Sequence, residues 1–244
     1  MNQDVGEGIG LPTVLITGAS RGLGLEFARQ YASDGWRVIA TCRRADLPGE
    51  LKEISGDINV REMDITDTDQ VTEVANYFRG VAIDVLLNNA GITGPDDQSV
   101  TFGDLDITTW HAVMGVNAMA PLKVAEAFLD NVKASEQKTV VFVSSRASSI
   151  SERGYLPHHQ PGGSYIFRSS KAALNSAAKN LSFDLAPSGV KVLVLSPGWV
   201  KTDAGGPNAE IDPCTSVRGM RRQIADIPAT AGQFRNYNGQ VIPW

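Results

Sequence analysis

The feature that most constrains this chain is a series of short apolar runs in which polar residues do not alternate. Runs without a period of two fit strands that are buried on both faces of a parallel sheet. The predicted strands span Thr13–Thr17, Arg37–Thr41, Ile58–Met63, Val85–Asn88, Thr139–Val143 and Lys191–Leu195. A last apolar segment, Gly239–Trp244, follows them.

Longer segments with helical periodicity lie between these runs. They are Leu23–Ser33, Thr68–Phe78, Thr108–Leu129 and Ser169–Leu185. Asp67 stands where its side chain can cap the second of these helices. Strands that alternate with helices predict an α/β fold, a doubly wound parallel sheet of about seven strands with helices on both faces.

Composition and charge narrow the function classes. The chain is 42% hydrophobic and 20% charged, as in an ordinary globular protein, and no repeat or linker divides it. We expect one domain over residues 13–244, after a flexible N-terminal extension, residues 1–12. The net charge of −5 gives no general attraction to nucleic acid or anionic membranes. No apolar run reaches the roughly 20 residues that span a bilayer.

These observations predict a cytoplasmic protein without a nucleic-acid or membrane partner. Residues 1–12 lack the charged-then-apolar pattern of a signal peptide. Cys42 and Cys214 are far apart and are not in a metal-ligand spacing, so neither a metal site nor a disulfide framework is expected.

Residues 204–228 interrupt the alternation of strands and helices. Asp212-Pro213 offers a helix cap followed by proline at the first helical position. A segment after the sixth strand lies beyond the carboxyl edge of the sheet, where ligands bind in such folds, so we interpret it as a substrate lid. Its apolar residues fit a substrate pocket and also fit plain helix packing: Ile211, Val217, Met220 and Ile224.

A glycine-rich turn follows the first strand and opens a helix, over Thr17–Gly24. Glycine lets the backbone approach a phosphate closely, and the helix N-terminus presents free N–H groups to it. This context favours a dinucleotide site over an ordinary strand-to-helix turn. Contacts to the dinucleotide are expected from Gly18, Ser20, Arg21, Gly22, Leu23 and Gly24.

The end of the second strand indicates which dinucleotide binds. Enzymes that use NAD usually place an acidic residue here, on the ribose 2′-hydroxyl. This chain has Arg43 and Arg44 instead, and no acid before Asp46. Because arginine grips a phosphate with two charge-assisted hydrogen bonds, we predict NADP(H), with Arg43 and Arg21 on its 2′-phosphate. The alternative is a solvated surface arginine, which fits Arg44 better than Arg43.

Further motifs follow in a fixed order. Asp64-Ile65 closes the third strand, Asn88-Asn89-Ala90-Gly91 follows the fourth, and Pro197-Gly198 follows the sixth. Together with the glycine turn they resemble the short-chain dehydrogenase/reductase family, over about Val14 to Trp244. The resemblance implies a Rossmann fold, with cofactor contacts from Asp64, Ile65, Asn89, Ala90, Gly91, Lys171, Pro197, Gly198, Val200 and Thr202. Residues 205–209 and Gly239–Trp244 look closest to the C-factor-like carbonyl reductase branch.

The resemblance also implies an active site. Asn117 matches the asparagine that helps to hold the active-site lysine through water, Ser145 matches the catalytic serine, and Lys171 matches the lysine of a Tyr-x-x-x-Lys motif. Four residues before Lys171 stands Phe167, where the family has its proton-donating tyrosine. Phenylalanine keeps the ring and loses the acid. We interpret the chain as a Tyr-to-Phe form with impaired activity, and a natural non-catalytic relative would look the same.

Tyr165 is the alternative proton donor. It precedes Lys171 by six residues, which is about 240° away on a helix, so it could reach the site only if residues 162–166 were loop. His158 and His159 could contact a polar substrate, or they could be exposed loop histidines. Ser145 could simply cap a strand end.

The leading hypothesis is therefore an NADP(H)-dependent enzyme that interconverts a small-molecule carbonyl and an alcohol. A non-catalytic NADP(H)-binding sensor or scaffold on the same fold is the alternative. Phe167 favours it, whereas the retained Asn117, Ser145 and Lys171 oppose it. The family resemblance also implies a homodimer or a homotetramer.

Overall fold

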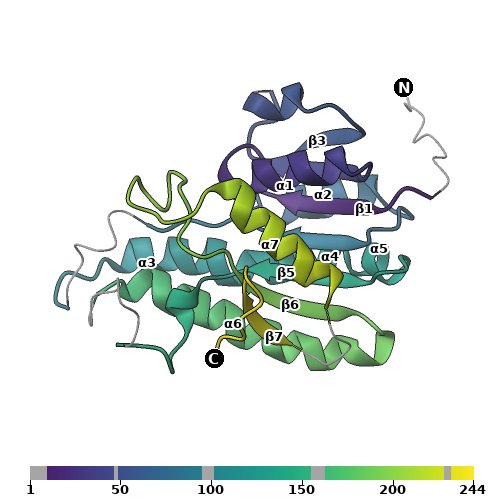
Figure 1. Cartoon of the computed structure of the whole chain (residues 1–244). Coiled ribbons are helices and arrows are strands. Elements are labelled where there is room, and N and C mark those ends of the chain that lie inside the picture. The colour runs from purple at the N-terminus through teal and green to yellow at the C-terminus, as the bar shows by residue number, and fades with distance from the viewer. Residues whose placement is uncertain (1–9, 47–48, 95–101, 155–162, 228–231) are drawn as a thin grey trace.

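A computed structural model describes residues 10–46, 49–94, 102–154, 163–227 and 232–244. Its strands form one parallel sheet of seven strands in the order β3-β2-β1-β4-β5-β6-β7, and helices cover both faces (Figure 1). The strands are β1 (Thr13–Thr17), β2 (Arg37–Cys42), β3 (Ile58–Glu62), β4 (Val85–Asn88), β5 (Thr139–Val143), β6 (Lys191–Ser196) and β7 (Gln233–Asn236). The predicted fold class is confirmed.

The first six strands lie where the apolar runs predict them, to within one residue at their ends. The seventh strand lies before the last apolar segment, at Gln233–Asn236. Residues 239–244 instead turn back, and Val241 makes an isolated antiparallel bridge with Arg235. This turn passes through Gly239, whose φ of +92° glycine adopts without strain.

The helices differ more from the prediction. They are α1 (Gly22–Ser33), α2 (Thr68–Tyr77), α3 (Ile107–Met114), α4 (Ala120–Ala127), α5 (Leu129–Lys133), α6 (Tyr165–Leu185) and α7 (Pro213–Ala225). The helix predicted over Thr108–Leu129 is continuous from Ile107 to Ala127, but a π-helical turn, Gly115–Met119, lies within it between α3 and α4, and it ends two residues earlier than predicted. Helix α6 begins four residues earlier than predicted, where Ile166 is buried against the core.

Aspartate side chains begin three of the helices. Asp67 accepts hydrogen bonds from the backbone N–H groups of Asp69 and Gln70, and Asp212 accepts one from Thr215. Both caps are as predicted. Asp106 caps α3 in the same way.

Apolar side chains fill both faces of the sheet. On one face Phe142 and its neighbours pack against α2, α4 and α6, and on the other Ile16 and its neighbours pack against α1 and α7. Val217 and Met220 of α7 are fully buried in this second cluster, so they follow the helix-packing alternative. Of the lid predicted over residues 204–228, only residues 204–212, which precede α7, remain a candidate lid. No helix in the described ranges is long and apolar enough to cross a membrane.

Candidate active site

Hydrogen bonds join the glycine turn after β1 to the end of β4. The backbone N–H groups of Asn89 and Ala90 donate to Thr17 Oγ1 at 3.0 and 3.1 Å. Asn89 Nδ2 donates to the carbonyl oxygens of Thr17 and Gly18 at 3.0 and 3.2 Å. The order of the strands reverses between β1 and β4, which is where open α/β sheets bind ligands.

The turn itself requires glycine. A Cβ atom on Gly24 would lie 2.2 Å from the carbonyl oxygen of Gly18, and one on Gly18 would lie 3.0 Å from Ala90. Helix α1 then begins without a side-chain cap and without an acidic residue in its first turn. An uncapped N-terminus behind a close backbone turn fits a pyrophosphate, so these residues are suited to a dinucleotide.

The side chain of Arg21, in the same turn, points to the segment after β6. Its Nη1 pairs with the carboxylate of Asp203 at 2.7 Å, and both side chains are mostly exposed. Thr202 also lies close to Gly22, so the glycine turn contacts the segment after β6. An exposed ion pair contributes little stability, and a phosphate can compete for Arg21.

The end of β2 carries the two other arginines. Arg44 pairs with Asp46 at 3.2 Å, which supports the view that it is a solvated surface residue. Arg43 is exposed, and its positive charge interacts electrostatically with the carboxylate of Asp64. Hydrogen bonds from Thr66 hold the pKa of Asp64 below its ordinary value, and the charge of Arg43 adds to this effect. Arg43 therefore lies on the side of the predicted adenosine site.

Lys171 is the buried amine of the site. Its Nζ donates to the carbonyl oxygen of Val143 at 2.9 Å, and burial lowers the pKa of Lys171 from 10.5 to about 8. A Cβ atom on Gly91 would lie 3.2 Å from both Lys171 Nζ and Asn117 Oδ1. The structure therefore brings Gly91, Asn117 and Lys171 together, from the end of β4, the π-helical turn and α6.

The π-helical turn places Asn117 in the interior. Its side chain is fully buried and pairs with the backbone of Ile92, accepting from the N–H at 2.9 Å and donating to the carbonyl at 2.8 Å. Nδ2 also donates to Ser170 Oγ at 3.0 Å. Such widened turns occur frequently at functional sites.

Ser145 is the second residue after β5. Its Oγ accepts a hydrogen bond from the N–H of Ala147 at 3.2 Å and so caps a short 3₁₀ turn, Arg146–Ser148. The hydroxyl oxygen thus caps this turn and not the strand end. Because capping uses a lone pair, the hydroxyl hydrogen can still donate to a substrate oxygen.

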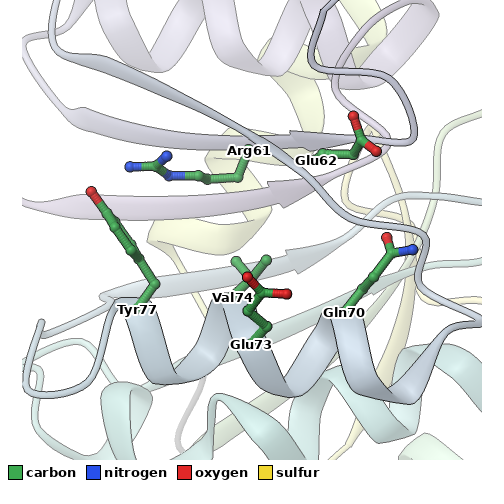
Figure 2. A pocket seen from close by; sticks show the side chains of 6 residues that line it. All are labelled: Arg61, Glu62, Gln70, Glu73, Val74 and Tyr77. Atoms are coloured by element: carbon green, nitrogen blue, oxygen red, sulfur yellow. The ribbon is translucent and has the colours of Figure 1, made fainter.

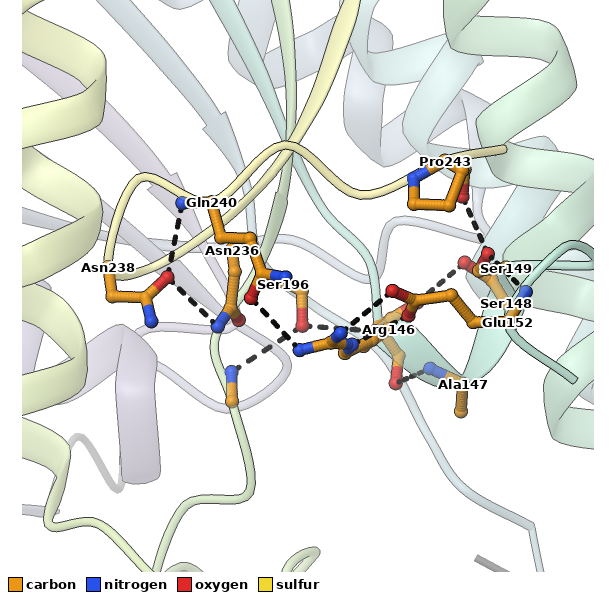
Figure 3. Close-up of polar contacts among 12 residues, drawn as sticks. Arg146, Ala147, Ser148, Ser149, Glu152, Ser196, Asn236, Asn238, Gln240 and Pro243 are labelled. Atoms are coloured by element: carbon orange, nitrogen blue, oxygen red, sulfur yellow. Dashed lines mark hydrogen bonds and ion pairs between the residues drawn. The ribbon is translucent and has the colours of Figure 1, made fainter. Parts of the chain in front are cut away.

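Contacts that the sequence analysis missed hold the loop after Ser145 (Figure 3). Arg146 makes two hydrogen bonds with Glu152, at 2.6 and 2.7 Å, and a third with Gln240 at 3.2 Å. The hydrogen bond with Glu152 raises the pKa of Arg146. Ser149 Oγ donates to the carbonyl of Pro243 at 2.6 Å. Residues 236–244 thus hold the loop, and partners 94 positions apart leave no local signal in the sequence.

Helix α6 places both aromatic candidates. Phe167 and Lys171 are one turn apart and share a side of α6. Tyr165 is the first residue of α6, is 36% exposed and lies about 240° around the helix from Lys171. Because Tyr165 and Ile166 belong to α6, they do not form the loop that would let Tyr165 reach the site. His158 and His159 lie outside the described residues.

The segment after β6 folds back on itself. Gly198 has a φ of +79°, and a Cβ atom on it would lie 2.8 Å from Ile211 and 2.9 Å from the ring of Tyr237. Val200 and Ile211 form a bridge, and Trp199 Nε1 donates to the carbonyl of Gly205 at 2.8 Å. Pro197, Gly198, Val200 and Thr202 thus lie in one compact turn beside the glycine turn.

A separate hollow lies at the edge of the sheet, between β3 and α2 (Figure 2). The guanidinium of Arg61 lies over the ring of Tyr77, 3.9 Å from its centre. The other residues that line it are Glu62, Gln70, Glu73 and Val74. None of the predicted site residues lines this hollow, which is therefore distinct from the site of Lys171.

The comparisons with known proteins agree with this geometry. Residues 12–211 match the family described as short chain dehydrogenase. The chain belongs to the short-chain dehydrogenase family. C-signal of Myxococcus xanthus is 39% identical over 163 residues, which are 66% of this chain and 93% of that protein.

Solved structures of the family share its whole architecture. The carbonyl reductase Sniffer of D. melanogaster has a TM-score of 0.86 at 29% identity, over 96% of this chain and 100% of that one. The NADPH-bound carbonyl reductase from chicken fatty liver has a TM-score of 0.85 at 29% identity, over 97% and 100%.

Proposed function

We propose that this short-chain dehydrogenase is an NADP(H)-dependent oxidoreductase that interconverts a carbonyl and an alcohol, and that Phe167 impairs this form of it. The observation that carries the proposal is the convergence of Gly91, Asn117 and Lys171 beside the end of β5, where Ser145 follows. A sensor would need the cofactor contacts but would not need the full set of Asn117, Ser145 and Lys171.

The residues of the predicted cofactor site fit the chemical groups of NADP(H). The glycine turn and the uncapped α1 suit the pyrophosphate, Asp64 and Ile65 would contact the adenine, and Arg43 would bind the 2′-phosphate. When bound, NADP(H) supplies or accepts the hydride. The chicken reductase, described as NADPH-bound, supports this choice of cofactor.

The chain's own residues place the substrate and handle the proton. The hydroxyl of Ser145 donates to the substrate oxygen, and Lys171 lies one turn from the residue that would donate the proton. With a pKa of about 8, Lys171 is mainly protonated at neutral pH, and its charge would lower the pKa of a phenol at position 167. The ring of Phe167 fills the position without an acid. Residues 204–212 are proposed to cover the substrate.

Phe167→Tyr tests this function. Because a general acid contributes ~10²–10⁴-fold, the variant should gain turnover of that order on a panel of aldehydes, ketones and alcohols, followed by NADPH absorbance. Tyr165→Phe is the matched control and should change nothing, because Tyr165 lies on another side of α6. If Phe167→Tyr binds NADPH and remains inactive on the whole panel, the catalytic proposal is wrong.

The second candidate is a non-catalytic sensor or scaffold that binds NADP(H). Phe167 favours it, since a chain without the proton donor retains only binding. The same experiment separates the two candidates. A sensor would bind NADPH equally well with Phe or Tyr at position 167 and would turn over no substrate in either form.

A further inference from the structure

We propose that Asn175 is a positioning residue, which holds Ser145 at a set place relative to Lys171. The inference rests on the proposed function, and none of the family motifs in this chain includes Asn175. Its side chain lies in a buried chain of polar groups that links α6 to the residues on both sides of Ser145.

The chain of hydrogen bonds is short and directional. Ser144 Oγ donates to Asn175 Oδ1 at 2.6 Å, and Asn175 Nδ2 donates to Ser148 Oγ at 2.7 Å. Ser148 Oγ in turn donates to the carbonyl oxygen of Ser145 at 2.5 Å. All three linking side chains are buried, so water is a poor substitute for these partners.

The position of Asn175 on α6 connects this hydrogen-bond network to Lys171. Asn175 follows Lys171 by four residues, so both side chains lie on the side of α6 that faces β5. Lys171 donates to the carbonyl of Val143, and Asn175 accepts from the next residue, Ser144. One side of α6 therefore fixes two positions: that of the Lys171 amine, and that of the end of β5, which Ser145 follows.

The carboxamide is the group that satisfies both ends. Its oxygen accepts from one serine and its nitrogen donates to another, so each hydroxyl keeps a single direction. Aspartate offers no donor, which would turn the hydroxyl of Ser148 away from the carbonyl of Ser145. Alanine would leave two buried hydroxyls without their partner.

The control comes from another buried asparagine. Asn131 Nδ2 donates to the carbonyls of Phe78 and Val81 at 2.6 and 2.8 Å, and its side chain is about as buried as that of Asn175. It contacts none of the site residues in these bonds. Asn131→Ala therefore loses a comparable buried amide without touching the loop of Ser145.

The first test uses the Phe167→Tyr protein. A misplaced hydroxyl should lower kcat by about 10- to 100-fold in both Asn175→Ala and Asn175→Asp, with the Kd for NADPH changed by less than about twofold. Asn131→Ala should lose stability and keep its kcat. Equal kcat values for the Asn175 variants and their parent, or the same fall in Asn131→Ala, would overturn the proposal.

The second test needs no turnover and uses the chain with Phe167. Amide hydrogen exchange of Ser148 and Ser149, whose N–H groups close the turn after Ser145, should become at least about tenfold faster in Asn175→Ala and stay unchanged in Asn131→Ala. Unchanged exchange in Asn175→Ala would overturn the proposal. If Phe167→Tyr proves inactive, the oxidoreductase function fails, and the exchange experiment alone decides whether Asn175 holds the loop.

Discussion

Among the described residues of the predicted site, Lys171 is the one whose pKa is strongly shifted by burial. Its amine is held in the interior by one carbonyl, and burial alone lowers its pKa to about 8. Burying a charged amine lowers the stability of the fold, because the charge loses its hydration. A hydrocarbon side chain at this position would not have this effect. Retention of lysine at a costly position agrees with a role toward cofactor and substrate.

That cost predicts a dependence of stability on pH. Because the pKa of Lys171 is lower in the folded protein than the ordinary 10.5, the contribution of Lys171 to the free energy of unfolding is complete above pH 10.5 and is lost as the pH falls through 8. The full difference amounts to roughly 3 kcal/mol. Urea unfolding between pH 7.5 and 10 should show the chain gaining stability relative to Lys171→Met as the pH rises. Parallel curves for the two proteins would contradict the lowered pKa.

At the scale of elements, α2 connects a helix cap to the predicted adenine site. Asp67 caps the helix through two backbone N–H groups, and its Oδ2 also accepts from Gln70 Nε2 at 2.9 Å. Gln70 Oε1 accepts from the N–H of Asp64 at 2.9 Å. The start of α2 therefore orients the loop that follows β3.

Asp67→Ala tests this connection. Loss of a cap should lower the free energy of unfolding by about 1 kcal/mol, in the range of roughly 0.5–2 kcal/mol. It should also weaken NADPH binding, because Gln70 loses one of its partners. Asp69→Ala is the control, since Asp69 lies in the first turn but its side chain is not the cap. Denaturant unfolding and an NADPH titration measure the two effects, and equal losses in both variants would contradict the capping role.

The elements also show where the sequence was sufficient. Buried parallel strands are nearly continuous apolar runs, so β1 to β6 could be located closely. Strand β7 was missed because Gln233 and Arg235 interrupt it, and only Phe234 and Asn236 are buried. The π-helical turn has no local signature, since contacts between Asn117 and Ile92 from another segment accompany it.

At the scale of the whole molecule, the topology of the sheet explains why the sequence indicates which residues come together, but not the contacts that hold the loop after Ser145. The carboxyl ends of parallel strands meet at one edge, so motif residues after β1, β3, β4, β5 and β6 are brought there by the topology. The contacts of Arg146 with Glu152 and Gln240 depend on how residues 236–244 return across the loop, which no spacing encodes. The roles of the individual site residues stay predictions.

Cofactor binding should therefore stabilise the protein as a whole. Because the predicted cofactor contacts come from several strand ends and exist only in the folded chain, NADPH binds the folded state alone. At 100 times its Kd it should raise the free energy of unfolding by about 2.7 kcal/mol. With Arg43→Ala, the rise in Tm at the same NADPH concentration should shrink, while the effect of NADH should not change. Arg44→Ala is the control, since Arg44 already pairs with Asp46. Thermal unfolding measures this, and identical shifts in both variants would remove the role of Arg43.

The π-helical turn at Gly115–Met119 has a consequence for engineering the chain. A wide turn holds one more residue than an ordinary helix needs, so the length of this region is a fixed count. Deleting a residue there would close the turn to an ordinary α-helical turn and leave Val124 of α4 in the core, but it would shift Asn117 away from its two hydrogen bonds with Ile92. Libraries that vary this helix should therefore exchange side chains and leave its number of residues unchanged.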